Sequence, residues 1–244
     1  MSKVSAKDAI IVVNGYRLST YFTQYEASVS VNPVEVTGFA DGSHNFLPTL
    51  QTAHISMAAL WDDAAGSLNT ALKGLSSNKI VTLLPEGYSA VGAVTLSLPY
   101  MQENFNPAGA PADVVKAGSI GFSSYGNNAG LEYGVALQHG TITATTTGTG
   151  VLDPTNGAVT AACAGALHVW SATTTDTYVV KIQHSTALAS GYADLITFTL
   201  DGTALNSERI TVASGTINKY RRMVATRTGS AGDTFGLTVH FWHA

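Results

Sequence analysis

The sequence predicts a mainly β protein made of two units with one short helix. Apolar and polar residues alternate in short runs along most of the chain, which is the pattern of strands with one buried face. Turn dipeptides separate these runs, namely Asn14-Gly15, Asn32-Pro33, Asp201-Gly202 and Ser214-Gly215. We therefore expect a β-sandwich or barrel with one short helix over residues 1–138, a Thr- and Gly-rich linker with a first strand over 139–160, and a small antiparallel β-sandwich over 161–244.

The stretch from Val34 to Gly74 organises the first unit. It reads as a strand, a long loop, a second strand and a helix. The second strand alternates, with one face formed by Ile55, Met57, Ala59 and Trp61. Asp62 or Asp63 is expected to cap the helix, because a carboxylate accepts the free amides of the first turn. The helix is expected to reach Leu72, and Gly74 to take the left-handed conformation that ends it. Its apolar face would consist of Leu68, Ala71, Leu72 and Leu75.

Further strands are expected on both sides of this stretch. In the first unit they are Ala9 to Val13, Glu26 to Val31, Lys79 to Leu84, Val91 to Leu98, Val114 to Phe122 and Leu131 to Leu137. In the second unit they are Ala166 to Ser171, Thr177 to His184, Leu195 to Leu200, Arg209 to Val212, Tyr220 to Thr226 and Phe235 to Phe241. No helical pattern is found in the second unit, so it does not repeat the helix of the first.

The loop from Gly38 to Pro48 is the candidate interaction site. A loop of about ten residues without structure of its own is uncommon in a compact domain and is usually functional. It carries Phe39, Phe46 and Leu47. Two interpretations stay open: these side chains fold back over their own sheet, or they dock on a neighbouring subunit.

Composition excludes several classes of function. The 244-residue chain is 45% hydrophobic and only 11% charged, which suits a packed core and a surface partly covered by neighbours. Its net charge of −4 gives no basic footprint for gripping nucleic acid. Before His139 there are ten acidic and six basic residues, and after it six of each, so the first half carries the whole negative charge. The apolar run near Met1 is too short for a secretory signal or a membrane span, so we expect synthesis in the cytoplasm and no membrane contact.

No catalytic, cofactor-binding or metal-binding site is predicted, and we expect no enzyme. The single cysteine, Cys163, is expected to be a small buried residue. His240 and His243 fall on opposite faces of a strand, which does not suit a shared metal. His168 and His184, with Asp194, lack a nucleophile and are expected to face solvent.

The only basic cluster is formed by Lys219, Arg221, Arg222 and Arg227. It is expected to be a solvated strand edge, or alternatively a contact with an acidic neighbour.

Several segments resemble the major tail proteins, or tail-tube proteins, of long-tailed non-contractile phages. In the first unit they are Asn14-Gly15-Tyr16 with Leu18-Ser19, Val34-Glu35-Val36-Thr37 with Phe39-Ala40-Asp41, Phe46-Leu47-Pro48 leading to Ile55-Ser56, and the Asp62 to Leu72 helix. The second unit is similar to a β domain appended to some of these proteins. The similar segments there are Leu167-His168-Val169, Val180 to Ser185, Glu208 to Val212 and Asn218-Lys219-Tyr220.

The resemblance implies a structural virion protein with a tail-tube-like β fold. Such subunits form stacked hexameric or pseudo-hexameric rings around a channel through which the genome leaves. Phe39, Asp41, Phe46 and Leu47 would then lie at a subunit interface, because the long loop of the family reaches a neighbour. The implied partners are other copies of the chain, other tail proteins and genome DNA that passes without specific binding. An acidic lumen suits such passage, since like charge keeps the DNA from sticking. The chain would be located in the virion tail.

Two alternatives stay open. One is another virion part, such as a head decoration or tail-completion protein. The other is a carbohydrate-binding β-sandwich, for which Trp170, Tyr178 and Trp242 would be the candidate residues.

Overall fold

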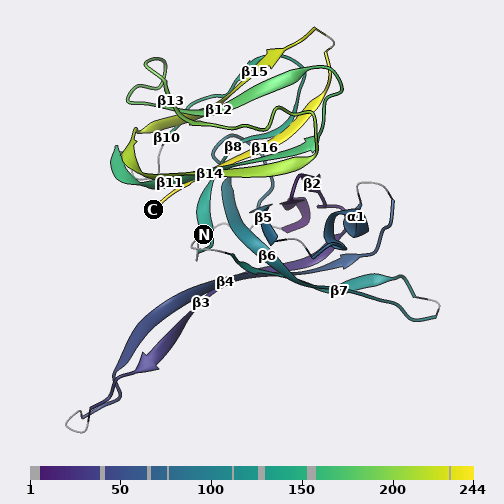
Figure 1. The fold of residues 1–244 in the computed structure, drawn as a ribbon, viewed down its shortest axis with the longest axis vertical. Helices are drawn as coiled ribbons and strands as arrows, with labels where there is room; N and C mark the ends of the chain where they lie inside the picture. The colour runs from purple at the N-terminus through teal and green to yellow at the C-terminus, as the bar shows by residue number, and fades with distance from the viewer. Residues whose placement is uncertain are drawn as a thin grey trace.

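The fold is mainly β, as predicted (Figure 1). The computed structural model describes residues 6–38, 42–64, 67–75, 77–111, 113–125, 130–152, 158–230 and 232–244. Within these ranges one α-helix, α1 (Leu68–Leu72), and one 3-10 turn, Ala6–Asp8, accompany the strands. No helix in the described ranges is long and apolar enough to cross a membrane.

The strands form two antiparallel sheets. The strands of the larger sheet are β1 (Ile10–Val13), β2 (Tyr16–Arg17), β3 (Phe22–Glu35), β4 (Phe46–Leu60), β5 (Ser77–Leu84), β6 (Val94–Ala108), β7 (Lys116–Ser124), β8 (Glu132–Ile142), β11 (Val159–Ser171), β14 (Asn206–Ile217) and β16 (Phe235–His243). The strands of the smaller sheet are β9 (Thr146–Thr147), β10 (Val151–Leu152), β12 (Thr177–Ser185), β13 (Ala193–Thr197) and β15 (Tyr220–Thr228).

Strand β6 joins the parts of the larger sheet. It pairs with β5, with the first residues of β8, and further along with β7. Strand β7 pairs with β4, and β4 with β3. In the other direction β8 pairs with β16, β16 with β11 and β11 with β14. The sheet is therefore continuous from the first half of the chain into the second.

Strands β1 and β5 lie in the middle of the molecule with both faces covered. All four residues of β1 are buried, which explains its unbroken apolar sequence. One face packs with α1, β4 and β7 into a core that contains Ile11, Leu72 and Phe122. The other face, with Thr82 of β5, is directed at β11.

The second half is a β-sandwich. Strands β12 and β15 of the smaller sheet pack on β8, β11 and β16 through a second core, in which Val180 and Met223 meet Leu167 and Val239. A strand overlaps each of the six predicted runs of this half, although β13 ends at Thr197, short of the predicted Leu200. Cys163 is buried, as predicted.

The Asn14-Gly15 turn connects the two halves. Both residues have positive φ, 46° and 80°. The Ser207 hydroxyl donates to Asn14 Oδ1 at 3.2 Å. A Cβ on Gly15 would lie 2.4 Å from the backbone nitrogen of Asn206. Glycine is required here by both its φ and its close approach to β14.

The helix is shorter than predicted, and its predicted caps are wrong. It begins after Ser67, whose hydroxyl donates to the Asp62 carbonyl at 2.8 Å and caps no helix amide. Asp62 accepts from the Ala64 amide at 2.8 Å and so stabilises a turn before the helix. After the C-cap Lys73, positive φ occurs at Leu75 and not at Gly74. Leu68 and Leu72 are buried as expected, whereas Leu75 is exposed.

The predicted strand boundaries differ mainly around the long loop. Asn32-Pro33 was expected to end a strand, but β3 continues to Glu35 and pairs Pro33 with Pro48 at a register shift. Strand β4 then begins at Phe46, within the predicted loop. Residues 139–160 contain the end of β8, then β9, β10 and the start of β11. The division into two units at residues 138 and 161 stays a prediction, and β8 runs across the first of these boundaries.

We predict that Gly15→Ala destabilises the fold. The added Cβ meets the β14 backbone and the residue keeps a positive φ, so we expect a loss of about 1–3 kcal/mol or more in the free energy of unfolding, measured by urea denaturation. Gly118→Ala is the control, because a Cβ there meets nothing within 4 Å. Equal stability of the two variants would contradict this account of the turn.

Candidate functional site

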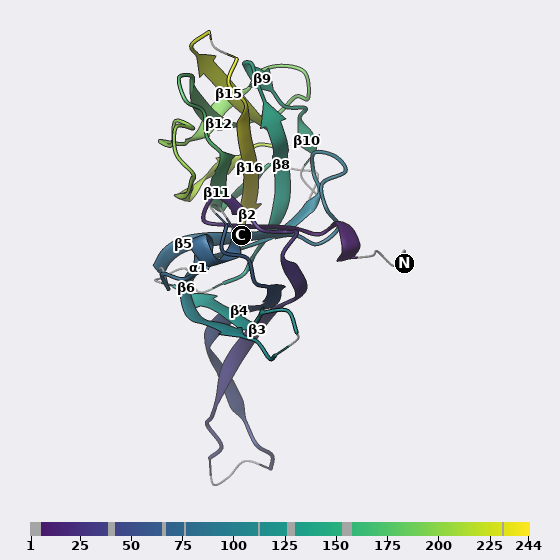
Figure 2. The ribbon, with the colours of Figure 1, turned by 90° about the vertical axis from the view of Figure 1, so that its right-hand side faces the viewer.

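A two-stranded ribbon projects from the body of the molecule. It consists of residues 28–35 of β3 and 46–52 of β4, and we call it the arm. Figures 1 and 2 show it extending away from the rest of the fold in both views. Every described side chain of residues 28–38, 42–47, 51 and 52 is exposed. The arm thus has two uncovered faces.

The arm is formed by cross-strand pairing alone. Val29 pairs with Ala53, Val31 with Gln51 and Glu35 with Phe46. Among the described strands β3 pairs only with β4, so no described strand covers its other edge. Such an edge is a template for pairing with a further chain.

Apolar side chains cover much of this exposed ribbon. They are Val29, Val31, Val34, Val36, Phe46 and Leu47. Phe46 and Leu47, predicted as interface residues, are 57% and 56% exposed, so neither folds back over its own sheet. Phe39 and Asp41, the other two predicted interface residues, lie outside the described residues. A contiguous exposed apolar surface of this kind marks an interaction site.

The end of the arm is ordered by a small polar cluster. Glu35 Oε1 accepts from the Thr37 hydroxyl at 2.7 Å and lies 2.5 Å from His44 Nδ1. These hydrogen bonds, first that of His44 and then that of Thr37, lower the pKa of Glu35. The Val36 amide donates to the Asn45 carbonyl at 2.8 Å and continues the pairing past β3.

A second polar cluster lies at the buried seam between the two halves. His168 Nε2 is hydrogen-bonded to the Thr82 hydroxyl at 2.8 Å. His240 Nδ1 is hydrogen-bonded to the hydroxyl of Thr95. These contacts join β11 and β16 to β5 and β6. His168 was expected to face solvent, and this is wrong: it is fully buried because strands from the first half cover the second face of β11.

His139 extends the seam within the second half. Its Nδ1 is hydrogen-bonded to the Thr238 hydroxyl at 2.7 Å, and the Trp170 indole donates to the same hydroxyl at 3.2 Å. Burial lowers the pKa of His139 to about 4, and the charge of Arg17 contributes. Burial lowers the pKa of His168 and of His240 to about 3. All three imidazoles are therefore neutral at pH 7.

The seam ends at a buried ion pair. Arg209 Nε donates to Glu132 Oε1 at 2.9 Å, and Arg209 Nη2 binds the same oxygen. Glu132 Oε2 lies 3.9 Å from His240 Nε2. Burial raises the pKa of Glu132, although the Arg209 hydrogen bond and charge act in the opposite direction.

The chain of contacts from Thr95 through His240 to Glu132 contains the hydroxyl, imidazole and carboxylate groups of a catalytic relay. A substrate could not reach these groups, however. Both Thr95 and His240 are fully buried. A nucleophile must reach the substrate, so we interpret this chain of contacts as structural.

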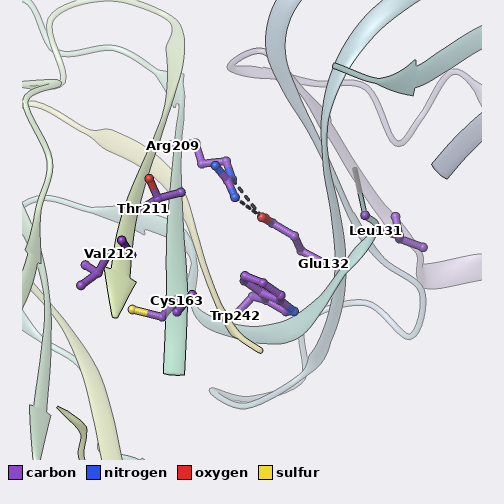
Figure 3. A pocket seen from close by; sticks show the side chains of 10 residues that line it. Leu131, Glu132, Cys163, Arg209, Thr211, Val212 and Trp242 are labelled. Carbon is purple, nitrogen blue, oxygen red and sulfur yellow. Dashed lines mark hydrogen bonds and ion pairs between the residues drawn. The ribbon is translucent and has the colours of Figure 1, made fainter. Parts of the chain in front are cut away.

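The ion pair borders a hollow of about 350 Å³ (Figure 3). Arg209 and Glu132 point toward one another in this view, with Trp242 and Cys163 nearby. The other lining residues are Gly130, Leu131, Ala162, Thr211, Val212 and Ala213. Trp242 also lines a second hollow, of about 190 Å³, together with Val94, Tyr133, Gly134, Val135, Arg221, Phe241 and His243.

The remaining candidate residues are dispersed. Arg221, expected at a solvated edge, is buried with its guanidinium 4.9 Å from the centre of the Phe241 ring. Arg222 is half-buried and donates to Gln183 Oε1 at 3.0 Å. Asp194 binds Lys181 at 2.6 Å, and His184 accepts from the Asn218 amide at 3.2 Å. Within the described ranges, no group of three or more His, Cys, Asp or Glu side chains could hold a metal ion.

The three predicted sugar-binding aromatics do not share a surface. Tyr178 is buried in the sandwich core against Phe235. Trp170 packs beside Ile10 of the first half with the Arg17 guanidinium 5.4 Å from its ring centre. Trp242 lines two hollows. The sequence pattern marked Trp242 only as a sugar-binding candidate and did not predict the hollows that it lines. The walls of these hollows come from strands that are distant in sequence, such as β8 with Tyr133.

Neither a protein-family model nor a curated protein matches the sequence. A chain in the virion of a native gene transfer agent particle is similar at 15% identity and a TM-score of 0.42, covering 54% of this chain and 98% of that chain. A chain in the tail of an empty gene transfer agent particle, with C6 symmetry, is similar at 15% identity and a TM-score of 0.40, covering 54% of this chain and 98% of that chain. The third similar structure is the SPP1 Dit (gp 19.1) protein, described as a paradigm of the hub adsorption apparatus in phages that infect Gram-positive bacteria. It is similar at 11% identity and a TM-score of 0.36, covering 97% of this chain and 99% of that chain. Likeness at these TM-scores carries no argument about function.

We predict that acid weakens the fold through the seam. An unfolded histidine has a pKa near 6.5, whereas His168 and His240 have values of about 3. Between these values the unfolded chain binds protons that the native chain does not. The contribution of these histidines to the free energy of unfolding is therefore fully present above pH 7 and is lost as the pH falls from about 6.5 toward 3. Each histidine accounts for a loss of about 1.4 kcal/mol per pH unit in this range. The raised pKa of Glu132 acts with the opposite sign.

Urea denaturation at pH 7, 6, 5 and 4 checks this prediction. His168→Gln keeps a hydrogen-bonding group for Thr82 but removes one of the three titrations of His139, His168 and His240, so its stability should fall about one third less steeply than that of the wild type between pH 6 and pH 4. Equal slopes for the two proteins would contradict a buried neutral His168.

We predict that Arg209→Met costs about 3 kcal/mol in the free energy of unfolding, because it leaves the Glu132 carboxylate buried without its charge partner. The double variant Glu132→Gln/Arg209→Met should recover most of this loss. Lys181→Met removes the exposed pair with Asp194 and should cost less than about 1 kcal/mol. Thermal or urea unfolding gives all three values, and equal losses in Arg209→Met and Lys181→Met would contradict the prediction.

Proposed function

We propose that this chain is a structural virion protein that assembles with copies of itself into stacked rings, which form the tube of a phage tail. The arm is the observation that carries the proposal. An isolated two-stranded hairpin is marginally stable in water, and this one exposes apolar side chains on a ribbon without a covering layer. A neighbouring subunit supplies that layer.

The form of the arm favours a tube over a closed dimer. The arm projects from one end of the fold and extends away from the body (Figure 2). An arm that inserts into a different surface of the next copy makes a head-to-tail contact. Such contacts close into rings or continue into open tubes. The sequence resemblance to tail-tube proteins supports the same assembly.

The charge distribution suits a channel for DNA. The acidic residues exceed the basic ones by four before His139 and equal them after it. We propose that the acidic first half faces the lumen, where like charge lets the genome pass without binding. The more neutral second half then lies toward the outside. Other tail proteins would meet the ends of the tube.

We predict that Phe46→Lys/Leu47→Lys prevents assembly while the chain stays folded. Both residues are exposed, so the fold loses no buried contact, but two charges would have to enter the interface. The concentration needed for assembly should rise at least tenfold, a change of about 1.4 kcal/mol or more. Sedimentation of a concentration series measures this, and electron microscopy identifies the products.

Val179→Lys/Leu188→Lys is the matched control, because both residues are exposed apolar side chains of the second half. It should assemble as the wild type does. Hollow tubes of regular pitch would support the tube, whereas discrete particles would favour a decoration or tail-completion protein. A wild-type chain that stays monomeric at high concentration would overturn the proposal.

A further inference from the structure

The seam between the two halves differs in composition from the two cores. Its buried apolar residues in the described chain are Ile10, Val12, Leu84 and Ala136, a smaller cluster than either core. Hydroxyls, imidazoles and the Trp170 ring supply much of the rest, where β2 and β5 lie against β11 and β14 (Figure 1). Local opening costs least free energy where little apolar surface is buried, so we expect the body to open most readily at the seam.

Three imidazoles lie together on the sheet face that the seam covers. His139 of β8 and His168 of β11 stand on the two sides of Thr238 in β16. His240 follows Thr238 by two residues and therefore points to the same face. His168 and His240 are fully buried, and His139 is 9% exposed. The seam thus holds a cluster of titratable groups away from water.

Each imidazole has a hydrogen-bonding partner at only one of its two ring nitrogens in the described chain. That partner is a threonine hydroxyl in each case. The second nitrogen, Nε2 of His139 and His240 and Nδ1 of His168, has no hydrogen-bond partner among the described residues. A neutral imidazole donates at one nitrogen and accepts at the other, whereas an imidazolium donates at both. Protonation in the closed seam would therefore bury a charge and an N–H without an acceptor.

His240 differs from the other two because a carboxylate lies beside it. Glu132 Oε2 is 3.9 Å from His240 Nε2, and Arg209 Nε donates to Oε1 of the same carboxylate. His168 is the titratable group on the β11 side of His240. Since Glu132 can compensate part of a charge on His240, the acid response of the seam falls mainly to the other two histidines.

His139 and His168 have no such compensation. In the described chain no carboxylate forms an ion pair with either ring, and the nearest charge to His139 is that of Arg17 in β2. Tyr88 packs 5.8 Å from the His139 ring centre and stays neutral in acid, because burial raises its pKa. His168 meets the neutral Thr82 hydroxyl of β5 and is influenced by the charge of His139. A proton on either ring is therefore stabilised only when water reaches the ring.

The pairing of β6 with β8 supplies a hinge for such an opening. Residues 94–97 of β6 pair with residues 132–135 of β8, and the Ala136 amide extends the pairing by donating to the Ala93 carbonyl at 2.8 Å. These backbone bonds lie within one continuous sheet and need not break when the side-chain contacts of the seam separate. His139 lies beyond this paired segment of β8, on the part that can move.

We propose that the seam is an acid-operated joint: protonation of His139 and His168 releases β1, β2 and β5 from β8, β11 and β16 while both cores stay folded. The pairing of β6 with β8 keeps the two halves connected. A part of the molecule thus opens before the whole chain unfolds. The joint belongs to the single subunit and does not rest on the proposed function.

Thiol labelling on the two faces of β1 tests the joint. In a Cys163→Ala background, Val12→Cys places a thiol in the seam and Val13→Cys places one in the first core, and both positions are fully buried. Val180→Cys reports on the second core. The rate of labelling by dithiodipyridine is divided by that of a free thiol at the same pH, which gives the protection of each site. Urea denaturation of each variant gives the protection that its global stability predicts.

At pH 5 the Val12→Cys thiol should be at least tenfold less protected than its global stability predicts, whereas the Val13→Cys and Val180→Cys thiols should match theirs. An imidazole exposed by opening has a pKa near 6.5, so opening should become about 20-fold more favourable between pH 7 and pH 5 for each of the two histidines. Adding His168→Gln to Val12→Cys should remove about 20-fold of this change.

Agreement with global stability at all three thiols would overturn the proposal, because the seam would then open only when the chain unfolds. A Val12→Cys protection that is the same at pH 7 and pH 5, or a His168→Gln chain with the full pH response, would overturn it as well. If Val12→Cys does not fold at pH 7, Ala136→Cys replaces it, because Ala136 is fully buried in the same seam cluster.

Discussion

The arm is governed by the constraint that a two-stranded ribbon has two faces and no interior. Its two strands, β3 and β4, pair along their shared edge, while its valines, Phe46 and Leu47 are exposed in the described chain. Burying apolar surface yields about 25 cal/mol per Å², so these side chains represent free energy that only a partner can recover. The two cores bury most large apolar side chains of the body, so the proposed assembly matters most for the arm, which no layer of the described chain covers.

The seam has the complementary task of making the two halves one body. A wholly apolar seam would pack in many registers, whereas the Thr82–His168 and Thr95–His240 hydrogen bonds satisfy their groups in one arrangement. The Asn14-Gly15 turn and the Glu132–Arg209 pair fix the same arrangement at other points.

Local patterns predicted the strands well and their surroundings poorly. The alternation in β16 correctly identified the face of Phe235, Leu237, Val239 and Phe241. It could not show that the other face is also covered, because the partner of His240 is Thr95, 145 positions away. The Asp62-Asp63 pair predicted a helix cap. In the structure the Ser67 hydroxyl donates a hydrogen bond to the Asp62 carbonyl, and the helix begins later than predicted. Asn32-Pro33 suggested an end of strand, but Pro33 opposes Pro48, where a register shift accommodates both prolines. The length of their loop singled out Phe46 and Leu47 but left open whether they fold back or stay exposed, because that depends on the pairing of β3 with β4. The hollow beside Trp242 is formed by residues of β8, β11, β14 and β16 and has no signature in any one segment.

Hydrogen exchange of the arm amides, before and after assembly, tests the central claim most directly. In the monomer the amides of residues 28–35 and 46–52 should exchange rapidly, as expected for a ribbon without tertiary cover. In assembled material they should become as protected as the amides of β11 and β16, because a neighbour then covers the ribbon. Assembled material in which the arm amides still exchange as rapidly as in the monomer would contradict the claim that the arm holds the subunits together.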